Sequence, residues 1–202
     1  MYQELSSVLK KYTPAEEALD LINSGYSNHK FMHKGENLFG EQYETWVYEY
    51  LKQWALQCND VTKYVLKNCK AKCLKTDGLT YDKNGQIVFI KNSVKLAEFD
   101  GLFFYKDKIV FIESSVSELR SYFRTLEDRV VSKRELLVEY FKTEEVYYLV
   151  VTRPRKKTLV YRSLPHLILY KIKNPDFSKI DRIDRVSTNK SDKLVMLDSI
   201  FS

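Results

Sequence analysis

The sequence predicts an α/β fold with a mixed central sheet, and three observations support this. Apolar residues recur at helical spacing over two long stretches, 40–57 and 117–142. Runs rich in β-branched and aromatic residues lie between and after them, at 96–105, 109–115 and 146–151. The order helix, strands, hairpin, helix, strand is typical of helices packed on a mixed sheet.

The first elements are an N-terminal helix and a long amphipathic helix. A short helical pattern follows Thr13-Pro14, and a polar loop around Gly25 and Gly35 comes next. In the stretch 40–57, apolar residues recur at helical spacing without an interrupting glycine or proline, at Val47, Leu51, Trp54 and Ala55. The segment 65–90 has turn signals at Asp77-Gly78 and Asn84-Gly85, which predict a hairpin or an irregular pair of strands.

The second half predicts a hairpin, a helix and a buried strand. The runs 96–105 and 109–115 flank the polar turn 106–108 and should pair as an antiparallel hairpin. Ser117 is a suitable N-cap for the helix 117–142. The run 146–151 is apolar throughout, as expected of a central strand buried on both faces. A further apolar piece, 164–172, precedes a charged tail.

Composition indicates one globular domain. The chain has 202 residues, of which 44% are hydrophobic and 30% charged, enough for one substantial core. We expect an N-terminal helix and loop at 1–35, a core at 36–152 and a C-terminal extension at 153–202. The net charge of +6 favours an anionic partner, although excess lysine also serves solubility. The first residues lack the pattern of a signal peptide, and no apolar run is long enough to span a bilayer, so we expect a cytoplasmic protein without membrane contact.

The predicted hairpin brings acidic residues together inside apolar strands. If its turn is centred on 106–107, Asp100 lies opposite Glu113 and Glu98 opposite Ser115, with all four on one face. Opposed carboxylates repel each other unless a cation lies between them, and paired oxygen ligands suit Mg²⁺ or Mn²⁺. The alternatives are a protonated acid, a pairing with lysine, or a register shifted by one residue.

This pattern resembles the PD-(D/E)xK nuclease superfamily. The resembling features are the acid and glycine of Asp100-Gly101 in one strand, a hydrophobic residue and Glu113 in the next, and a following helix. The resemblance covers about residues 36–152 and implies a restriction-endonuclease-like core of order αβββαβ. Asp100 and Glu113 match the two acidic positions and would bind Mg²⁺ or Mn²⁺.

A third acid often precedes these strands in that superfamily, on a helix. The segment 40–47 is similar to its pattern and makes Glu44 the matching metal ligand, with Glu41 in reserve. Glu44 shares a helix face with Val47 and Leu51, which places it at the start of the core-facing stripe. The alternative is a solvent-exposed glutamate at the helix N-terminus.

The chain departs from the superfamily at Ser115, which stands where a lysine normally orients or deprotonates the attacking water. Members sometimes move this basic group, and Arg120, or else Arg124, is the candidate here. Arginine stays protonated, so it would clamp phosphate rather than act as a base. Without a recruited basic group, the fold would be an inactive nucleic-acid- or protein-binding module.

The resemblance therefore implies a metal-dependent endonuclease acting on duplex or branched DNA. The small chain resembles compact archaeal Holliday-junction resolvases and virus-encoded nucleases of this superfamily, which act as homodimers. If the protein is virus-encoded, we expect it in the host cytoplasm. The basic residues of 153–157, with Arg120, Arg124, Arg129, Lys133 and Arg134, would follow a nucleic-acid backbone or form a solvated face. Tyr147, Tyr148 and Tyr161 are better explained as buried strand residues than as base-stacking platforms.

The three cysteines are open to three interpretations. In the simplest, Cys58, Cys69 and Cys73 are ordinary reduced thiols. In the second, Cys69 and Cys73 bind a metal with His29 or His33. In the third, which the resemblance to the nuclease superfamily implies, all three cysteines bind an iron-sulfur cluster, although a fourth cysteine is absent.

Overall fold

A mixed five-stranded sheet forms the centre of the molecule. The computed structural model describes residues 2–13, 38–67, 76–115, 119–152 and 166–172, together with residues 193, 195, 197 and 200. The strands are β1 (Val61–Leu66), β5 (Gly101–Tyr105), β6 (Lys108–Ser115), β7 (Val146–Thr152) and β8 (Leu167–Lys171). They lie in the order β1-β5-β6-β7-β8; β1, β5 and β6 are antiparallel, and β6, β7 and β8 are parallel. The predicted α/β class with a mixed sheet is confirmed.

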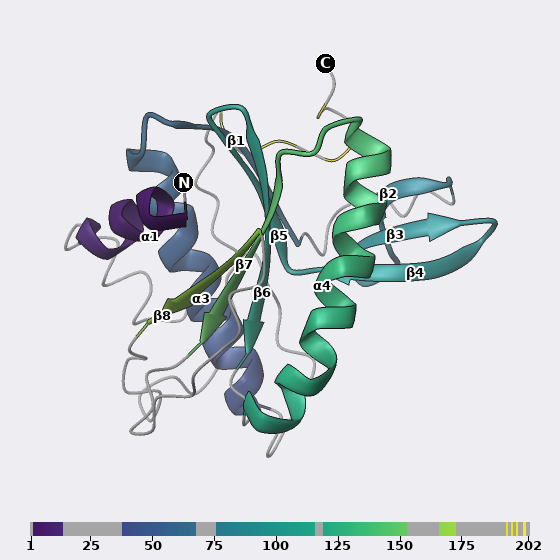
Figure 1. Ribbon diagram of the computed structural model, residues 1–202, viewed down its shortest axis with the longest axis horizontal. Coiled ribbons are helices and arrows are strands. Elements are labelled where there is room, and N and C mark those ends of the chain that lie inside the picture. The colour runs from purple at the N-terminus through teal and green to yellow at the C-terminus, as the bar shows by residue number, and fades with distance from the viewer. Residues whose placement is uncertain are drawn as a thin grey trace.

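Helices cover both faces of this sheet (Figure 1). Helices α1 (Tyr2–Lys11) and α3 (Leu38–Gln57) pack on one face, and α4 (Leu119–Phe141) packs on the other. The helices expected at 40–57 and 117–142 are thus confirmed as α3 and α4, apart from residues 117 and 118, which are not described. Helix α1 precedes Thr13, and the helix expected after Thr13-Pro14 lies outside the described residues. None of the described helices has both the length and the apolar character that a membrane span requires.

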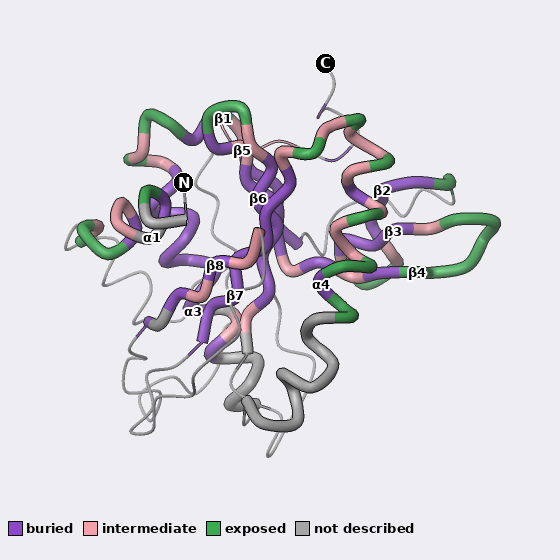
Figure 2. The backbone as a smooth tube through the Cα atoms, in the orientation of Figure 1, coloured by how far each residue is buried: buried purple, intermediate pink, exposed green. Residues whose placement is uncertain are grey.

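Strand β7 is buried at every position, as its apolar run predicted. Tyr147 and Leu149 belong to the core under α1 and α3, whereas Tyr148 and Val150 belong to the core under α4. Figure 2 shows this buried centre flanked by exposed helix surfaces and turns. Both faces of the sheet are therefore buried at β7, and polar groups near this strand need partners from within the protein.

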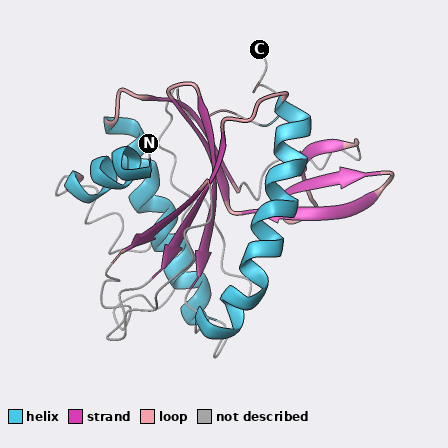
Figure 3. Ribbon diagram, viewed as in Figure 1, coloured by secondary structure: helices cyan, strands magenta, loops and turns pink. Residues whose placement is uncertain are grey.

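A second, three-stranded antiparallel sheet extends beside α4 (Figure 3). It consists of β2 (Gly78–Tyr81), β3 (Ile87–Lys91) and β4 (Val94–Phe99). The turn between β2 and β3 is organised by Asp82, whose Oδ1 accepts the backbone N–H groups of Asn84 (2.8 Å) and Gln86 (3.0 Å). Gly85 takes a positive φ of 76° in that turn, so the hairpin predicted from Asn84-Gly85 is confirmed.

The run 96–105 is divided between the two sheets. Strand β4 ends at Phe99 and β5 begins at Gly101, with Asp100 at the bend between them. A Cβ on Gly101 would lie 3.0 Å from Leu66 Cδ2 and 3.3 Å from the Val65 carbonyl oxygen. Glycine therefore lets β1 approach closely where the chain changes sheets.

This division corrects part of the predicted hairpin. The pairing of Tyr105 with Lys108 is confirmed, and the same register carries Asp100 to the level of Glu113. The predicted pairing of Glu98 with Ser115 is wrong: Glu98 lies opposite Val88 in the second sheet. Ser115 lies beside Thr152 of β7. The expectation that Glu98, Asp100, Glu113 and Ser115 share one face fails because the chain bends at Asp100.

Candidate functional site

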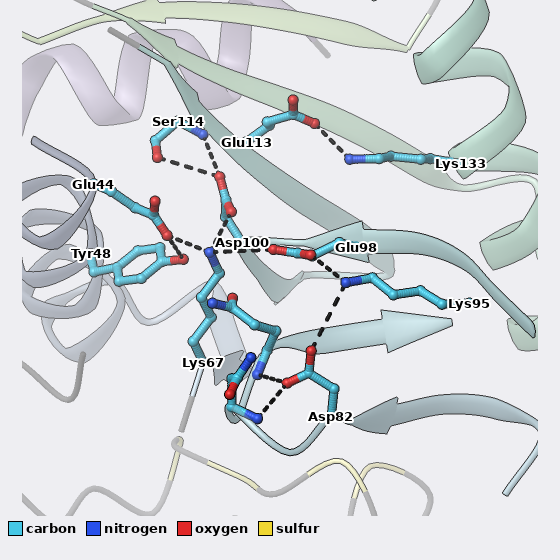
Figure 4. A network of polar contacts seen from close by, with 12 residues as sticks. Glu44, Tyr48, Lys67, Asp82, Lys95, Glu98, Asp100, Glu113, Ser114 and Lys133 are labelled. Atoms are coloured by element: carbon cyan, nitrogen blue, oxygen red, sulfur yellow. Dashed lines mark hydrogen bonds and ion pairs between the residues drawn. The ribbon is translucent and has the colours of Figure 1, made fainter. Parts of the chain in front are cut away.

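Two of the three predicted metal ligands meet at the bend between the sheets (Figure 4). Lys67, the residue after β1, joins them: its Nζ binds a carboxylate oxygen of Glu44 on α3 and lies 2.9 Å from Oδ1 of Asp100. All three side chains are mostly buried, with exposed fractions of 22% for Glu44, 14% for Asp100 and 6% for Lys67. Three segments distant in sequence thus form one charged cluster.

The second oxygen of Asp100 is fixed by β6. Asp100 Oδ2 accepts the backbone N–H of Ser114 at 2.7 Å and its hydroxyl at 3.3 Å. Ser114 neighbours Ile112 on the face of β6 that packs under α3, since side chains alternate along a strand. The bend therefore turns the Asp100 carboxylate toward the α3 side, where Glu44 lies.

Tyr48 supports the cluster from α3. One turn after Glu44, it donates its hydroxyl to a Glu44 oxygen at 2.8 Å, and Lys67 Nζ lies 5.7 Å from its ring centroid. Glu44 therefore begins the core-facing stripe as expected, and it is only partly exposed. The alternative of a fully solvent-exposed Glu44 does not describe its environment.

The electrostatics of the cluster differ between its members. Burial, followed by repulsion from Asp100, raises the pKa of Glu44, and Lys67 and Tyr48 offset only part of this. Burial also opposes ionisation of Asp100, but the Lys67 charge and the Ser114 N–H lower its pKa. Burial likewise opposes the Lys67 charge, yet Asp100 and Glu44 outweigh it, so the pKa of Lys67 is raised. Lys67 is therefore a stable cation rather than a base.

Glu98 connects this cluster to the second sheet. Its Oε1 lies 4.0 Å from Lys67 Nζ, and its Oε2 accepts a hydrogen bond from Lys95 Nζ at 2.6 Å. Lys95 in turn lies 3.9 Å from Asp82 Oδ2 in the β2–β3 turn. A chain of alternating charges thus extends from the bend along β4.

Glu113 has a different set of partners. Arg129 donates to its Oε1 at 2.6 Å and Lys133 to its Oε2 at 2.7 Å, and both donors lie on α4. The hydroxyl of Tyr148 on β7 also binds Oε2. By strand alternation Glu113 shares the face of Phe111, which packs under α4. Glu113 lies level with Asp100 in the register, but its carboxylate is neutralised on the other side of the sheet.

Several predicted positions are described by their backbone alone. Ser115 is the last residue of β6, Arg120 and Arg124 lie in the first half of α4, and Glu41 lies on α3. Their side chains lie outside the described part of the structure. The proposed replacement of the missing lysine by Arg120 therefore stays a prediction.

Other candidates are partly described. Cys58 is half-buried at the end of α3 and packs against the α3-side core. Tyr147 and Tyr148 are buried, in agreement with the structural interpretation of these residues. Arg134 binds the backbone and side chain of Glu144, so it supports the connection from α4 to β7. The remaining candidates lie outside the described residues: His29, His33, Cys69, Cys73, Tyr161 and the basic segment 153–157.

The donor set at the bend fits a hard divalent cation. Glu44 and Asp100 offer carboxylate oxygens, and Mg²⁺ commonly uses one or two carboxylates and completes its shell with water and phosphate. The described residues contain no group of three or more His, Cys, Asp or Glu side chains arranged to hold a metal. The Lys67 ammonium lies between the two carboxylates, so a metal ion bound by both would replace it there.

Comparison with known proteins adds no assignment. No protein-family model matches this chain, and no curated protein resembles it in sequence.

Proposed function

We propose that this protein is a metal-dependent endonuclease that hydrolyses DNA phosphodiester bonds, as a member of the PD-(D/E)xK superfamily. The observation that carries the proposal is the convergence of Glu44, Asp100 and Lys67 at one bend. Glu44 and Asp100 belong to separate sequence motifs, and the resemblance to the superfamily assigned both to one metal site. We propose Lys67, the residue after β1, as the counterpart of the lysine expected at position 115, in place of Arg120.

The order of the elements supports the same proposal. Helix α3, the antiparallel strands β1, β5 and β6, helix α4 and the parallel strand β7 follow the order αβββαβ. In a restriction-endonuclease-like core, the metal-binding acids and the motif lysine lie on the first helix and the antiparallel strands. Here α3, β1, β5 and β6 would take those places. Strands β2 to β4 are then an insertion between the first and second core strands.

In this proposal Glu44 and Asp100 hold Mg²⁺ or Mn²⁺, which when bound would activate water and polarise the scissile phosphate. The Ser114 N–H fixes the Asp100 carboxylate, and Tyr48 fixes that of Glu44. Lys67 stays protonated and moves from the carboxylates to a non-bridging phosphate oxygen, where it stabilises developing negative charge.

The reaction proposed is simple hydrolysis. Water attacks phosphorus, and the bond from phosphorus to the leaving oxygen breaks. The hydroxyl of the water remains on phosphorus, and the other proton of that water ends on the leaving oxygen. Because Lys67 is a stable cation, its role is to hold the phosphate and not to remove a proton from water.

The second candidate is a catalytically inactive nucleic-acid- or protein-binding module on the same fold. One observation favours it: Glu113, the acid of the second motif, is neutralised by Arg129 and Lys133. A carboxylate held by two cations and a tyrosine hydroxyl is a poor metal ligand. Ser115 in place of the motif lysine supports the same candidate.

Cleavage of end-labelled duplex, single-stranded and four-way-junction DNA in Mg²⁺ or Mn²⁺ distinguishes the two. We expect wild type to cut at least one substrate and Asp100→Asn and Glu44→Gln to cut at least 100-fold more slowly. Glu139→Gln is the matched control, because it neutralises an exposed carboxylate of α4 that pairs with Lys91 of β3. Each variant is checked for folding by circular dichroism.

Binding of DNA without metal-dependent cutting would favour the inactive module. Retained cutting in a folded Asp100→Asn variant would contradict the proposed site. Sedimentation of the protein with each DNA tests the homodimer, since a two-fold axis presents one site to each strand of a duplex or branched molecule.

A further inference from the structure

A hollow of about 520 Å³ lies between β4 and α4, beside the charged cluster of Glu44, Lys67 and Asp100. The hollow is wide open to solvent, so it suits one unit of a longer chain better than an enclosed small molecule. Glu98 belongs to both places: it lines the hollow, and its Oε1 lies 4.0 Å from Lys67 Nζ. The hollow is therefore adjacent to the Asp100 site, and one bound strand would occupy both.

Three cationic side chains from two elements line this hollow, together with the acids Glu98 and Asp128. Lys95 comes from β4, and Arg129 and Lys133 lie one turn apart on the facing side of α4. Glu98 and Glu113 hold these cations in position. Lys95 and Arg129 keep 47% and 42% of their side chains exposed, so both can reach a ligand from their present places.

The hollow also has an apolar side. In the pairing of β3 with β4, Ala97 lies opposite Phe89 and Lys95 opposite Ile90, so Leu96 has no partner. This bulge leaves Leu96 49% exposed on the wall of the hollow. Bulged edge strands resist pairing with another strand, so the exposed leucine is better suited to a ligand than to sheet extension.

A nucleotide unit has the matching chemistry, since its phosphate is anionic and its sugar and base offer apolar surface. We propose that the β4–α4 hollow seats a nucleotide next to the scissile phosphate of the bound strand. Lys95 and Arg129 bind its phosphate, and Leu96 contacts its base or sugar. This inference rests on the proposed function and names how the substrate strand is held.

The test measures binding without cutting. Fluorescence anisotropy of a labelled 20-nucleotide single strand is recorded with the full chain in EDTA. We expect Lys95→Gln to weaken binding at least threefold and to reduce the dependence of log Kd on log salt by about one. Ser132→Trp fills the hollow from α4 and should weaken binding at least tenfold. Lys91→Gln removes the same charge from β3 outside the hollow and should change binding less than twofold.

Two results would overturn the inference. One is equal loss in Lys95→Gln and Lys91→Gln, which would indicate a diffuse basic surface. The other is wild-type binding by a folded Ser132→Trp variant. Competition with poly-glutamate adds a third check: the inference requires that unlabelled DNA displace the probe at much lower charge concentration than the polypeptide does.

The outcome is separable from that of the proposed function. If wild type cuts DNA and the hollow variants bind and cut like wild type, the hollow has no such role while the nuclease proposal stands. If the hollow variants lose binding and no protein cuts DNA, the hollow binds nucleic acid and the nuclease proposal fails.

Discussion

The ammonium of Lys67 lies 2.9 Å from Oδ1 of Asp100 and also binds the Glu44 carboxylate. One buried cation thus joins a strand end, a helix and the bend between two sheets. Removing one partner from a buried ionic cluster costs more than the cluster contributes to stability, because the remaining charges are left uncompensated. The stability of Lys67 variants therefore reports on this cluster.

Replacement of Lys67 by methionine should destabilise the protein by about 3 kcal/mol at neutral pH. Added Mn²⁺ should restore part of this loss by binding between the two carboxylates that have lost their ammonium partner, by roughly 2.7 kcal/mol at 100 times its Kd. The measurement is urea unfolding with and without Mn²⁺, with Lys91→Met as the exposed control. A variant as stable as wild type, or one indifferent to Mn²⁺, would contradict the proposed cation site.

Glu44→Gln should change stability in a pH-dependent way. Burial and the repulsion of Asp100 raise the pKa of Glu44. A carboxyl with a raised folded-state pKa contributes stability below its unfolded pKa, about 4.3, and loses it as pH rises through the folded value. The variant lacks this loss, so its free energy of unfolding relative to wild type should increase from acid to neutral pH. The measurement is denaturant unfolding at several pH values, with Glu139→Gln as control. If the free energy of unfolding of Glu44→Gln depended on pH in the same way as that of wild type, the prediction would be refuted.

A double-mutant cycle should show strong coupling between Glu113 and Lys133. Their contact of 2.7 Å is mostly buried, and Tyr148 shares the same oxygen. We expect the double alanine variant to be less destabilised than the sum of the single variants, by roughly 0.5–3 kcal/mol. The exposed pair of Lys91 and Glu139 should couple by less than about 1 kcal/mol. Equal coupling in the two cycles would show that Glu113 is not held as described.

Gly101→Ala should destabilise the protein by roughly 1–3 kcal/mol. The added Cβ would approach the Val65 carbonyl oxygen to 3.3 Å, and a backbone atom cannot rotate away as the Leu66 methyl can. Chemical unfolding measures the effect. A neutral result would mean that the glycine of the Asp100-Gly101 pair is not needed for the bend.

The sequence predicted those elements of the fold that depend on local patterns alone. The periodicity of 40–57 gave the bounds of α3 within two residues, and the polar turn at 106–107 gave the hairpin register. The bend at Asp100 was not predicted, because the run 96–105 has the apolar composition of one continuous strand. Only long-range pairing of β4 with β3 divides it, and alternation within a single strand carries no information about that pairing.

The same limit explains what was missed at the site. Glu44 and Asp100 were predicted from their motifs, but Lys67 follows a strand-like run in the same way as many surface lysines and has no distinguishing local signal. Pairing of an acid with lysine was among the alternatives, but the sequence could not name Lys133 and Arg129 as partners of Glu113, because these contacts depend on the packing of α4 over β6. The basic residues of that helix were noted, but as contacts for a nucleic-acid backbone.

Calorimetric titration of Mn²⁺ into the protein tests the proposed metal site most directly. We expect one site in wild type, tighter binding in Lys67→Met, where the competing ammonium is gone, and at least a tenfold loss in a folded Asp100→Asn variant. Absence of binding in wild type, or equal binding in wild type and Asp100→Asn, would contradict the assignment of Glu44 and Asp100 as the ligands.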